Sequence, residues 1–149
     1  MTTVREARPA DRPRLRAIQT GALVEPWPDL LSVGLDGDVP LVFVVEADVV
    51  VGYAVVVTAD TVAYIAEFAI APDRQRQGYG STLMERLLSR LAVEEYETVT
   101  LTVRATDDGP QSFYAVHGFA IDRRVPAHYD DGTDGLVLSR SLGTDVTAE

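Results

Sequence analysis

The sequence predicts a mixed α/β protein in which helices cover both faces of a central sheet. Two apolar, β-branched stretches at residues 41–46 and 49–58 are separated by a two-residue turn, which predicts a hairpin. Two further β-rich stretches, 61–70 and 98–104, flank a segment at 80–93 whose leucines recur with helical spacing. Strands that alternate with amphipathic helices in this way pack as layers around one core.

Residues 1–40 contain a short strand and one helix. Residues 3–8 favour a strand, and Pro13 is tolerated in the first turn of the helix that follows, where its missing N–H is not needed. The apolar residues of that helix share one stripe, which predicts that one side is buried. We expect no long helix in residues 29–39, because three helix-breaking residues lie in or next to them: Gly34, Gly37 and Pro40.

Residues 98–141 supply a second group of elements. A short helix at 109–117 ends at Gly118, which is expected in the left-handed conformation that closes helices. Strands at 119–125 and 135–141 then form an antiparallel pair. The polar residues 143–149 are expected to fray, so that one domain spans residues 1–142.

Composition limits the chemistry and the partners. The chain has no cysteine and two histidines, so neither a thiolate nucleophile nor a metal cluster is expected. The formal charge of −10 disfavours nucleic-acid partners. All thirteen basic residues are arginines, which together with the acidic charge is typical of halophilic proteins, although a GC-rich genome has the same effect. No signal peptide or membrane span is visible, so we expect a cytoplasmic protein.

A glycine-hinged turn at residues 75–80 is the strongest functional signal. It follows the strand that ends at Ile70 and opens directly onto the helix at 80–93. Gly78 and Gly80 remove the Cβ atoms that would hold a ligand away, so that consecutive N–H groups at the start of the helix dipole can bind one anion. A P-loop would need a Lys-Ser/Thr ending, and a dinucleotide fingerprint a third glycine; neither is present.

The GNAT N-acetyltransferase superfamily has an acetyl-CoA pyrophosphate loop that resembles Gln75-x-x-Gly78-x-Gly80 together with the strand end before it. Its ribosomal-protein-alanine N-acetyltransferase subgroup resembles the chain over residues 4–142. That resemblance implies a mostly antiparallel central sheet with a splayed central strand pair. The motifs that carry it are Glu25-Pro26-Trp27, residues 101–107, Phe113-Tyr114-x-x-x-Gly118-Phe119, Arg123-Arg124 and residues 128–134.

The resemblance also implies how acetyl-CoA would be held, with no metal. The main chain of residues 68–70 would pair with the pantetheine arm and polarise the acetyl carbonyl, and residues 75–81 would hold the pyrophosphate. Asp107 stands where the subgroup has an asparagine, which weakens a CoA contact there. The implied cofactor-binding residues are Phe68, Ala69, Ile70, Gln75, Arg76, Gln77, Gly78, Tyr79, Gly80, Ser81 and Asp107.

Acetyl transfer to an amine needs a base for the amine proton and an acid for the departing thiolate. Tyr114 matches the tyrosine assigned as the general acid in the superfamily. Thr102 stands where the subgroup has a glutamate, and a threonine is no base near neutral pH. Three substitutes remain open: Glu67, one residue before the pantetheine-binding backbone, which leads; Tyr64; and Glu25. An ordinary ion pair on the sheet face is the alternative for Glu67, and packing is the alternative for Tyr64.

The substrate side of the resemblance involves Glu25 and Trp27 after the first helix, and Tyr129 in a hairpin whose aspartates would attract a cationic amine. We expect direct acetyl transfer through a ternary complex to a primary amine. A protein N-terminus is the first choice of acceptor and a small-molecule amine the second. A catalytically silent acyl-CoA-binding sensor is the alternative from another class. Both a monomer and a homodimer remain open.

Overall fold

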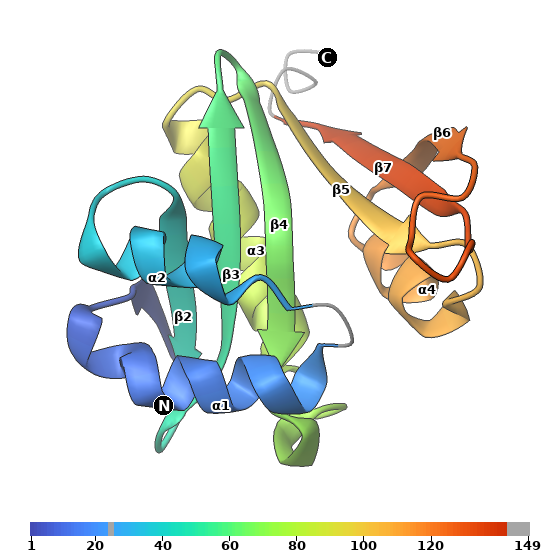
Figure 1. The fold of residues 1–149 in the computed structure, drawn as a ribbon. Coiled ribbons are helices and arrows are strands. Elements are labelled where there is room, and N and C mark those ends of the chain that lie inside the picture. The colour runs from blue at the N-terminus through green and yellow to red at the C-terminus, as the bar shows by residue number, and fades with distance from the viewer. Residues whose placement is uncertain (24–25, 143–149) are drawn as a thin grey trace. The chain divides into compact units, whose positions relative to one another are not determined.

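The structure is a computed structural model that describes residues 1–23 and 26–142. Its strands follow the order β1-β2-β3-β4-β5-β7-β6 (Figure 1). The chain divides into two compact units, a first unit of Met1–Thr58 with Ile65–Arg90 and a second unit of Ala59–Tyr64 with Leu91–Glu149. No helix in the described part of the chain is long and apolar enough to cross a membrane.

The first unit is a helix-covered group of strands. Strands β1 and β2 pair antiparallel, as do β2 and β3. Helices α1 and α2 lie on one face of these strands and α3 lies on the other (Figure 1). Each of the following elements lies in this unit over all or most of its length: β1 (Thr3–Glu6), the 3₁₀ turn η1 (Pro9–Asp11), α1 (Arg12–Ala22), α2 (Pro28–Asp36), β2 (Leu41–Glu46), β3 (Val50–Ala59), β4 (Val62–Ile70), the 3₁₀ turn η2 (Pro72–Arg74) and α3 (Tyr79–Val93).

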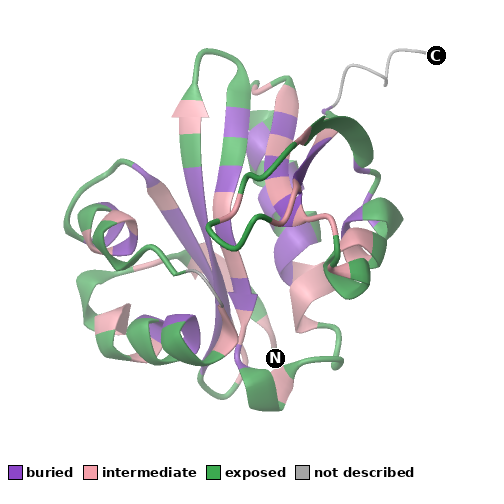
Figure 2. Cartoon of the chain, turned by 45° about the vertical axis from the view of Figure 1, so that its right-hand side comes forward, coloured by how far each residue is buried: buried purple, intermediate pink, exposed green. Residues whose placement is uncertain are grey.

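The core of the first unit joins α1 and α2 to the sheet. Buried residues concentrate in the strands, whereas the loops are mostly exposed (Figure 2). Along β4, odd-numbered residues from Ala63 to Ala69 are buried and even-numbered ones are more exposed, as strict strand alternation requires. The core cluster contains Leu15, Ile18, Leu31, Leu35, Val42, Val44, Val50, Tyr53, Val55, Ala69 and Ala71.

The second unit is built on β5 (Thr98–Arg104), α4 (Asp108–Val116), β6 (Ala120–Val125) and β7 (Gly135–Ser141). Strand β7 pairs antiparallel with both β5 and β6. The start of β4 pairs in parallel with β5, Val62–Tyr64 opposite Thr98–Thr100. This mixed, mostly antiparallel sheet with its helices confirms the predicted fold class.

Residues 28–36 form the short, nine-residue helix α2, which is consistent with the expectation of no long helix but runs through Gly34. A Cβ atom at Gly34 would lie 2.6 Å from a methyl carbon of Val42 and 3.0 Å from the carbonyl oxygen of Pro40. The glycine therefore allows α2 to approach β2 closely, which sequence analysis mistook for a helix-breaking signal. The cost of glycine in a helix is offset by burial of Leu31 and Leu35.

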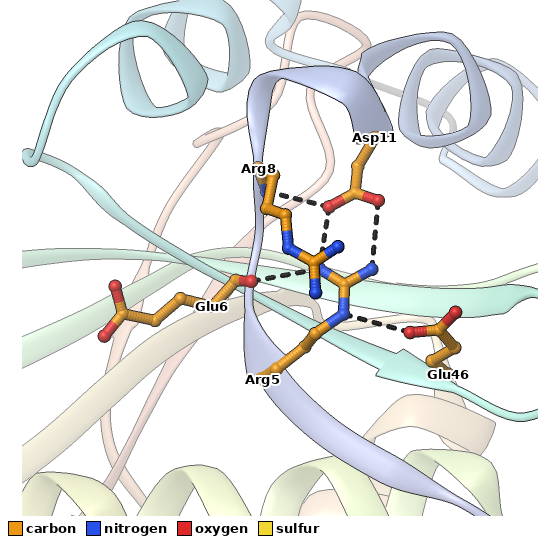
Figure 3. Close-up of polar contacts among 5 residues, drawn as sticks. All are labelled: Arg5, Glu6, Arg8, Asp11 and Glu46. Carbon is orange, nitrogen blue, oxygen red and sulfur yellow. Dashed lines mark hydrogen bonds and ion pairs between the residues drawn. The ribbon is translucent and has the colours of Figure 1, made fainter.

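A cluster of ion pairs fastens β1 to its neighbours (Figure 3). The Arg5 guanidinium donates to both carboxylate oxygens of Asp11, at 2.9 and 3.1 Å, and to Glu46 at 2.9 Å. Asp11 also accepts the backbone N–H of Arg8 at 2.8 Å. The hydrogen bond from Arg5 holds the pKa of Asp11 below its usual value.

Candidate active site

The loop between β4 and α3 has the backbone shape of an anion site. Arg76 and Gly78 both have positive φ, 64° and 90°. A Cβ atom at Gly78 would have no neighbour within 4 Å, so glycine is favoured there by its conformation, and the space beside it is open. The N–H of Thr82 donates to the Gly78 carbonyl at 3.1 Å and begins the helical ladder. Helix α3 begins at Tyr79, so this loop leads into a helix N-terminus, a place where backbone N–H groups commonly bind phosphate.

Side chains of the same loop stabilise its shape. Gln75 Nε2 donates to the Ile70 carbonyl at 3.0 Å and ties the loop to the end of β4. Arg74 makes two hydrogen bonds to Asp48, at 2.8 and 3.0 Å, and lowers the pKa of that carboxyl to about 2. Gln77 Nε2 donates to the backbone oxygen of residue 73 at 3.3 Å. These side chains hold the backbone in place.

The end of β4 is fixed against β3. A Cβ atom at Gly52 would lie 2.4 Å from Ile70 Cδ1 and 2.8 Å from the Ala69 oxygen, so only glycine permits this approach. Ala69 is buried, whereas Phe68 and Ile70 are half-buried. The predicted pantetheine-binding backbone therefore lies on a strand end that neighbouring backbone holds rigidly.

Glu67 is buried at the centre of the first unit, with 6 % of its surface exposed. Its Oε1 accepts hydrogen bonds from Tyr53 Oη at 2.7 Å and from Gln19 Nε2 at 2.9 Å. Its Oε2 accepts the backbone N–H of Trp27 at 2.6 Å. All three donors are neutral, so this environment differs from the ion pair considered as an alternative. We call Gln19, Trp27, Tyr53 and Glu67 the carboxylate cluster.

Sequence analysis missed Gln19 and Tyr53, although each left a signal. Gln19 lies on the otherwise apolar, buried side of α1, beside Ile18. Tyr53 is fully buried in an aliphatic strand, and burial together with the charge of Glu67 raises its pKa above the ordinary value. A polar side chain on an apolar face needs a buried partner. Among the described residues, no buried side-chain nitrogen or oxygen lacks one.

Tyr114 is the predicted proton donor and lies in α4 of the second unit, with 9 % of its surface exposed. Its ring packs edge-on against Phe119, with centroids 5.8 Å apart. Burial raises the pKa of the Tyr114 phenol, so it stays protonated at neutral pH. Gly118 ends the helix with φ 88°, as expected, and the Arg140 guanidinium donates to the His117 carbonyl at 2.7 Å beside it.

Two other predicted residues meet in the second unit. The Tyr64 hydroxyl donates to Thr102 Oγ1 at 3.1 Å. Tyr64 is 36 % exposed. Asp107 is half-buried and precedes α4, where its carbonyl oxygen accepts the N–H of Gln111 at 3.3 Å.

The hairpin loop between β6 and β7 is organised by arginines. The Arg104 guanidinium lies 4.3 Å from the centre of the Tyr129 ring and donates to Asp131 at 2.9 Å. Hydrogen bonds from Thr133 and then Arg104 lower the pKa of Asp131 to about 2. Asp134 accepts the N–H of Ala127 at 2.8 Å and Arg124 Nε at 2.6 Å. Part of the negative charge expected to attract an amine is therefore neutralised within the loop.

The remaining substrate candidates lie near α2. Glu25 lies outside the described residues. Trp27 immediately precedes α2 and is 56 % exposed. Within residues 1–23 and 26–142, no three or more His, Cys, Asp or Glu side chains are grouped to hold a metal ion.

Comparison with known proteins identifies relatives along nearly the whole chain. The profile of the acetyltransferase (GNAT) family matches residues 4–119. The chain is 27 % identical over 136 residues to [ribosomal protein bS18]-alanine N-acetyltransferase from Escherichia coli K12, covering 91 % of each chain.

Solved structures of similar fold also match nearly the whole chain. The crystal structure of the ribosomal-protein-S18-alanine N-acetyltransferase from Escherichia coli matches with a TM-score of 0.87 and 25 % identity, over 97 % of this chain and 96 % of that one. Ard1 from Thermoplasma volcanium matches with a TM-score of 0.84 and 31 % identity, over 95 % and 98 %. A GNAT family acetyltransferase from Elizabethkingia anophelis with acetyl-CoA bound has a TM-score of 0.81 and 19 % identity, over 95 % and 98 %.

Proposed function

Because the chain belongs to the acetyltransferase (GNAT) family and is an N-acetyltransferase, we propose that it transfers the acetyl group of acetyl-CoA directly to the α-amine of a protein N-terminus. The observation that carries the proposal is the match to the ribosomal-protein-alanine enzyme over 91 % of both chains. At this coverage the match is not confined to the cofactor loop. Acetyl-CoA itself is supported by the acetyl-CoA bound to the relative from Elizabethkingia anophelis.

The loop at residues 75–81 fits the pyrophosphate of acetyl-CoA. Gly78 leaves open space beside a backbone with positive φ, and the loop leads into the N-terminus of α3, which favours an anion. Acetyl-CoA supplies an activated acetyl group as a thioester. The main chain of residues 68–70 would hold it beside the acceptor, and Asp107 would contribute a weaker contact.

Tyr114 holds a proton on its phenol at neutral pH and would donate it to the departing sulfur. Glu67 led the sequence candidates for acceptor of the amine proton, but both its oxygens already accept hydrogen bonds from neutral donors, so Tyr64 is the remaining candidate in the described residues. The bond from Tyr64 to Thr102 favours a modified acceptor site, so a small-molecule amine is the second candidate substrate.

Incubation with acetyl-CoA and a set of peptides and small amines tests the proposal. We expect release of free CoA thiol with a peptide, and mass spectrometry that locates the acetyl group on the peptide's N-terminal amine. Acetylation of a small amine alone would favour the second candidate substrate.

Tyr114→Phe tests the proton donor. We expect kcat to fall by about 10²–10⁴-fold, the usual contribution of general acid catalysis, while acetyl-CoA still binds by calorimetry. Tyr96→Phe, a half-buried tyrosine after α3, is the control and should keep the wild-type rate. An unchanged kcat in Tyr114→Phe would exclude the assigned role.

A further inference from the structure

One buried carboxylate holds both ends of the connection between α1 and α2. At the α1 end, Gln19 donates from its side chain to Glu67 Oε1 at 2.9 Å. At the α2 end, the Trp27 backbone N–H donates to Glu67 Oε2 at 2.6 Å. Tyr53 of β3 donates to Oε1 at 2.7 Å and restrains the carboxylate from the sheet side. The connection is therefore fastened to β4 at two points.

Trp27 is fixed through its backbone, while its side chain is half exposed. Its N–H binds Glu67, and its carbonyl oxygen accepts the N–H of Leu31 at 3.3 Å in the first turn of α2. Pro28 follows at the first helical position, where no N–H is needed. The indole, 56 % exposed, is thus presented from a rigid point. Tryptophan is enriched among the residues that carry the binding energy of protein interfaces.

We propose that Glu67 is a positioning residue. By accepting the Trp27 N–H, it holds the backbone at Trp27, just before α2, where the polypeptide that carries the acceptor amine binds. The inference rests on the proposed function and on the resemblance that places Trp27 on the substrate side, where the acceptor polypeptide would bind. Glu67 acts on that acceptor through Trp27 and not as the acceptor of its proton.

The hydrogen bonds that the Glu67 carboxylate already accepts favour a positioning role over a role as acceptor of the amine proton. Both oxygens of Glu67 already accept hydrogen bonds, and the residue is 6 % exposed. Three of the four lone-pair sites of the carboxylate are therefore occupied, and freeing any of them would displace a donor, so only the second lone pair of Oε2, in a buried position, remains for a proton. Loss of the Trp27 N–H would release the loop, and loss of Tyr53 or Gln19 would leave a buried donor unpaired, which is costly.

Glutamine at position 67 keeps the cluster intact without a carboxylate. Its carbonyl oxygen can accept the Trp27 N–H, and its NH₂ can face Gln19 and Tyr53. The Gln19 amide can turn to present its oxygen, and the Tyr53 hydroxyl can accept as well as donate. Methionine has similar length but offers no comparable acceptor, so Glu67→Met releases the loop.

Trp27 is the only tryptophan of the chain, so its fluorescence reports this loop alone. We would measure Trp27 emission and acrylamide quenching in the wild type, Glu67→Gln and Glu67→Met, and steady-state kinetics from pH 6 to 9 with a peptide bearing an N-terminal alanine. We expect Glu67→Gln to keep the wild-type emission and a kcat within about threefold at every pH. Glu67→Met should shift the emission, increase quenching and raise the peptide KM about tenfold, with a smaller effect on kcat.

Two results would overturn the proposal. One is a Glu67→Gln enzyme with native emission whose kcat falls by more than about a hundredfold, as expected for loss of a base. The other is a folded Glu67→Met protein with wild-type emission and KM. If Glu67→Met does not fold, Tyr53→Phe replaces it, with the same direction of change at smaller size. Fluorescence needs no turnover, so a wild type inactive on the peptide would count against the proposed function while the loop anchor is still tested.

Discussion

A buried carboxylate of the first unit and two loop carboxylates of the second unit are held in opposite ways. In the first unit, Glu67 is buried and accepts hydrogen bonds from neutral donors. In the second unit, Asp131 and Asp134 lie in the β6–β7 loop, and their carboxylates bind arginines and backbone amides close to solvent. A carboxylate therefore satisfies buried donors in one region and stabilises an exposed loop in the other.

This difference determines which residues tolerate change. A buried donor that loses its acceptor cannot turn to water, so its desolvation is uncompensated. A surface carboxylate exchanges its partner for water at little cost, and salt screens its attraction to arginine. Stability should therefore depend on the carboxylate cluster at any ionic strength, and on the hairpin loop only at low ionic strength.

The largest expected effect comes from Glu67→Ala, which removes the acceptor of three donors. We expect a loss of about 3–5 kcal/mol in the free energy of unfolding, because three neutral donors lose their acceptor at about 1–3 kcal/mol for each one left buried and unpaired. Urea denaturation followed by circular dichroism measures it. Asp130→Ala, at an exposed position of the hairpin loop, is the matched control and should unfold like the wild type. A loss below about 1 kcal/mol would contradict the anchoring role of Glu67.

An intermediate effect is expected for Asp11→Asn, which breaks a largely buried ion pair of the first unit. The pKa of Asp11 is lowered in the folded protein, mainly by the hydrogen bond from Arg5. The stabilisation is therefore complete above the ordinary value of 3.8 and is lost as the pH falls through the lowered folded value. We expect Asp11→Asn to cost about 1–2 kcal/mol at pH 7 and progressively less in acid.

Unfolding of Asp11→Asn and wild type should be compared across this pH range. Asp60→Asn serves as control, because Asp60 is exposed and has a φ of 53°, which asparagine tolerates. A stability difference that stays constant down to the lowest pH would show that the charge of Asp11 is not what stabilises the fold.

The smallest effect is expected for Asp134→Asn. Asparagine can still accept the Ala127 N–H, so only the attraction to Arg124 is lost. The melting temperature should fall slightly at low salt and equal that of the wild type at about 1 M salt. A decrease that is the same at both salt concentrations would remove the contrast between the two units.

Much of the fold could be predicted because its signals are local. The strands at 98–104 and 135–141 have the predicted bounds, and Gly118 has the left-handed conformation expected after a short helix. Gly34 shows the limit of such signals. The role of Gly34 is to let Val42 and Pro40 pack closely against α2, and this contact forms only in the folded protein. The sequence around Gly34 does not reveal the contact and therefore indicated a break in the helix.

The candidate site was predicted less completely, because its contacts join distant residues. The loop before α3 was found from its glycines, which act on their own backbone. The environment of Glu67 depends on Gln19 and Tyr53, which are 48 and 14 residues away in sequence, and on a backbone amide that no residue type reveals. Sequence alone therefore identified Glu67 as unusual and did not reveal its partners.

The carboxylate cluster also has a consequence for how the protein can evolve. Since an acceptor at position 67 satisfies Gln19, Tyr53 and the Trp27 amide together, a change at one side chain alters what the other two must provide. Relatives that replace Glu67 with an apolar residue should therefore also replace Gln19 and Tyr53 with apolar residues, so that these three positions covary through divergence of the family.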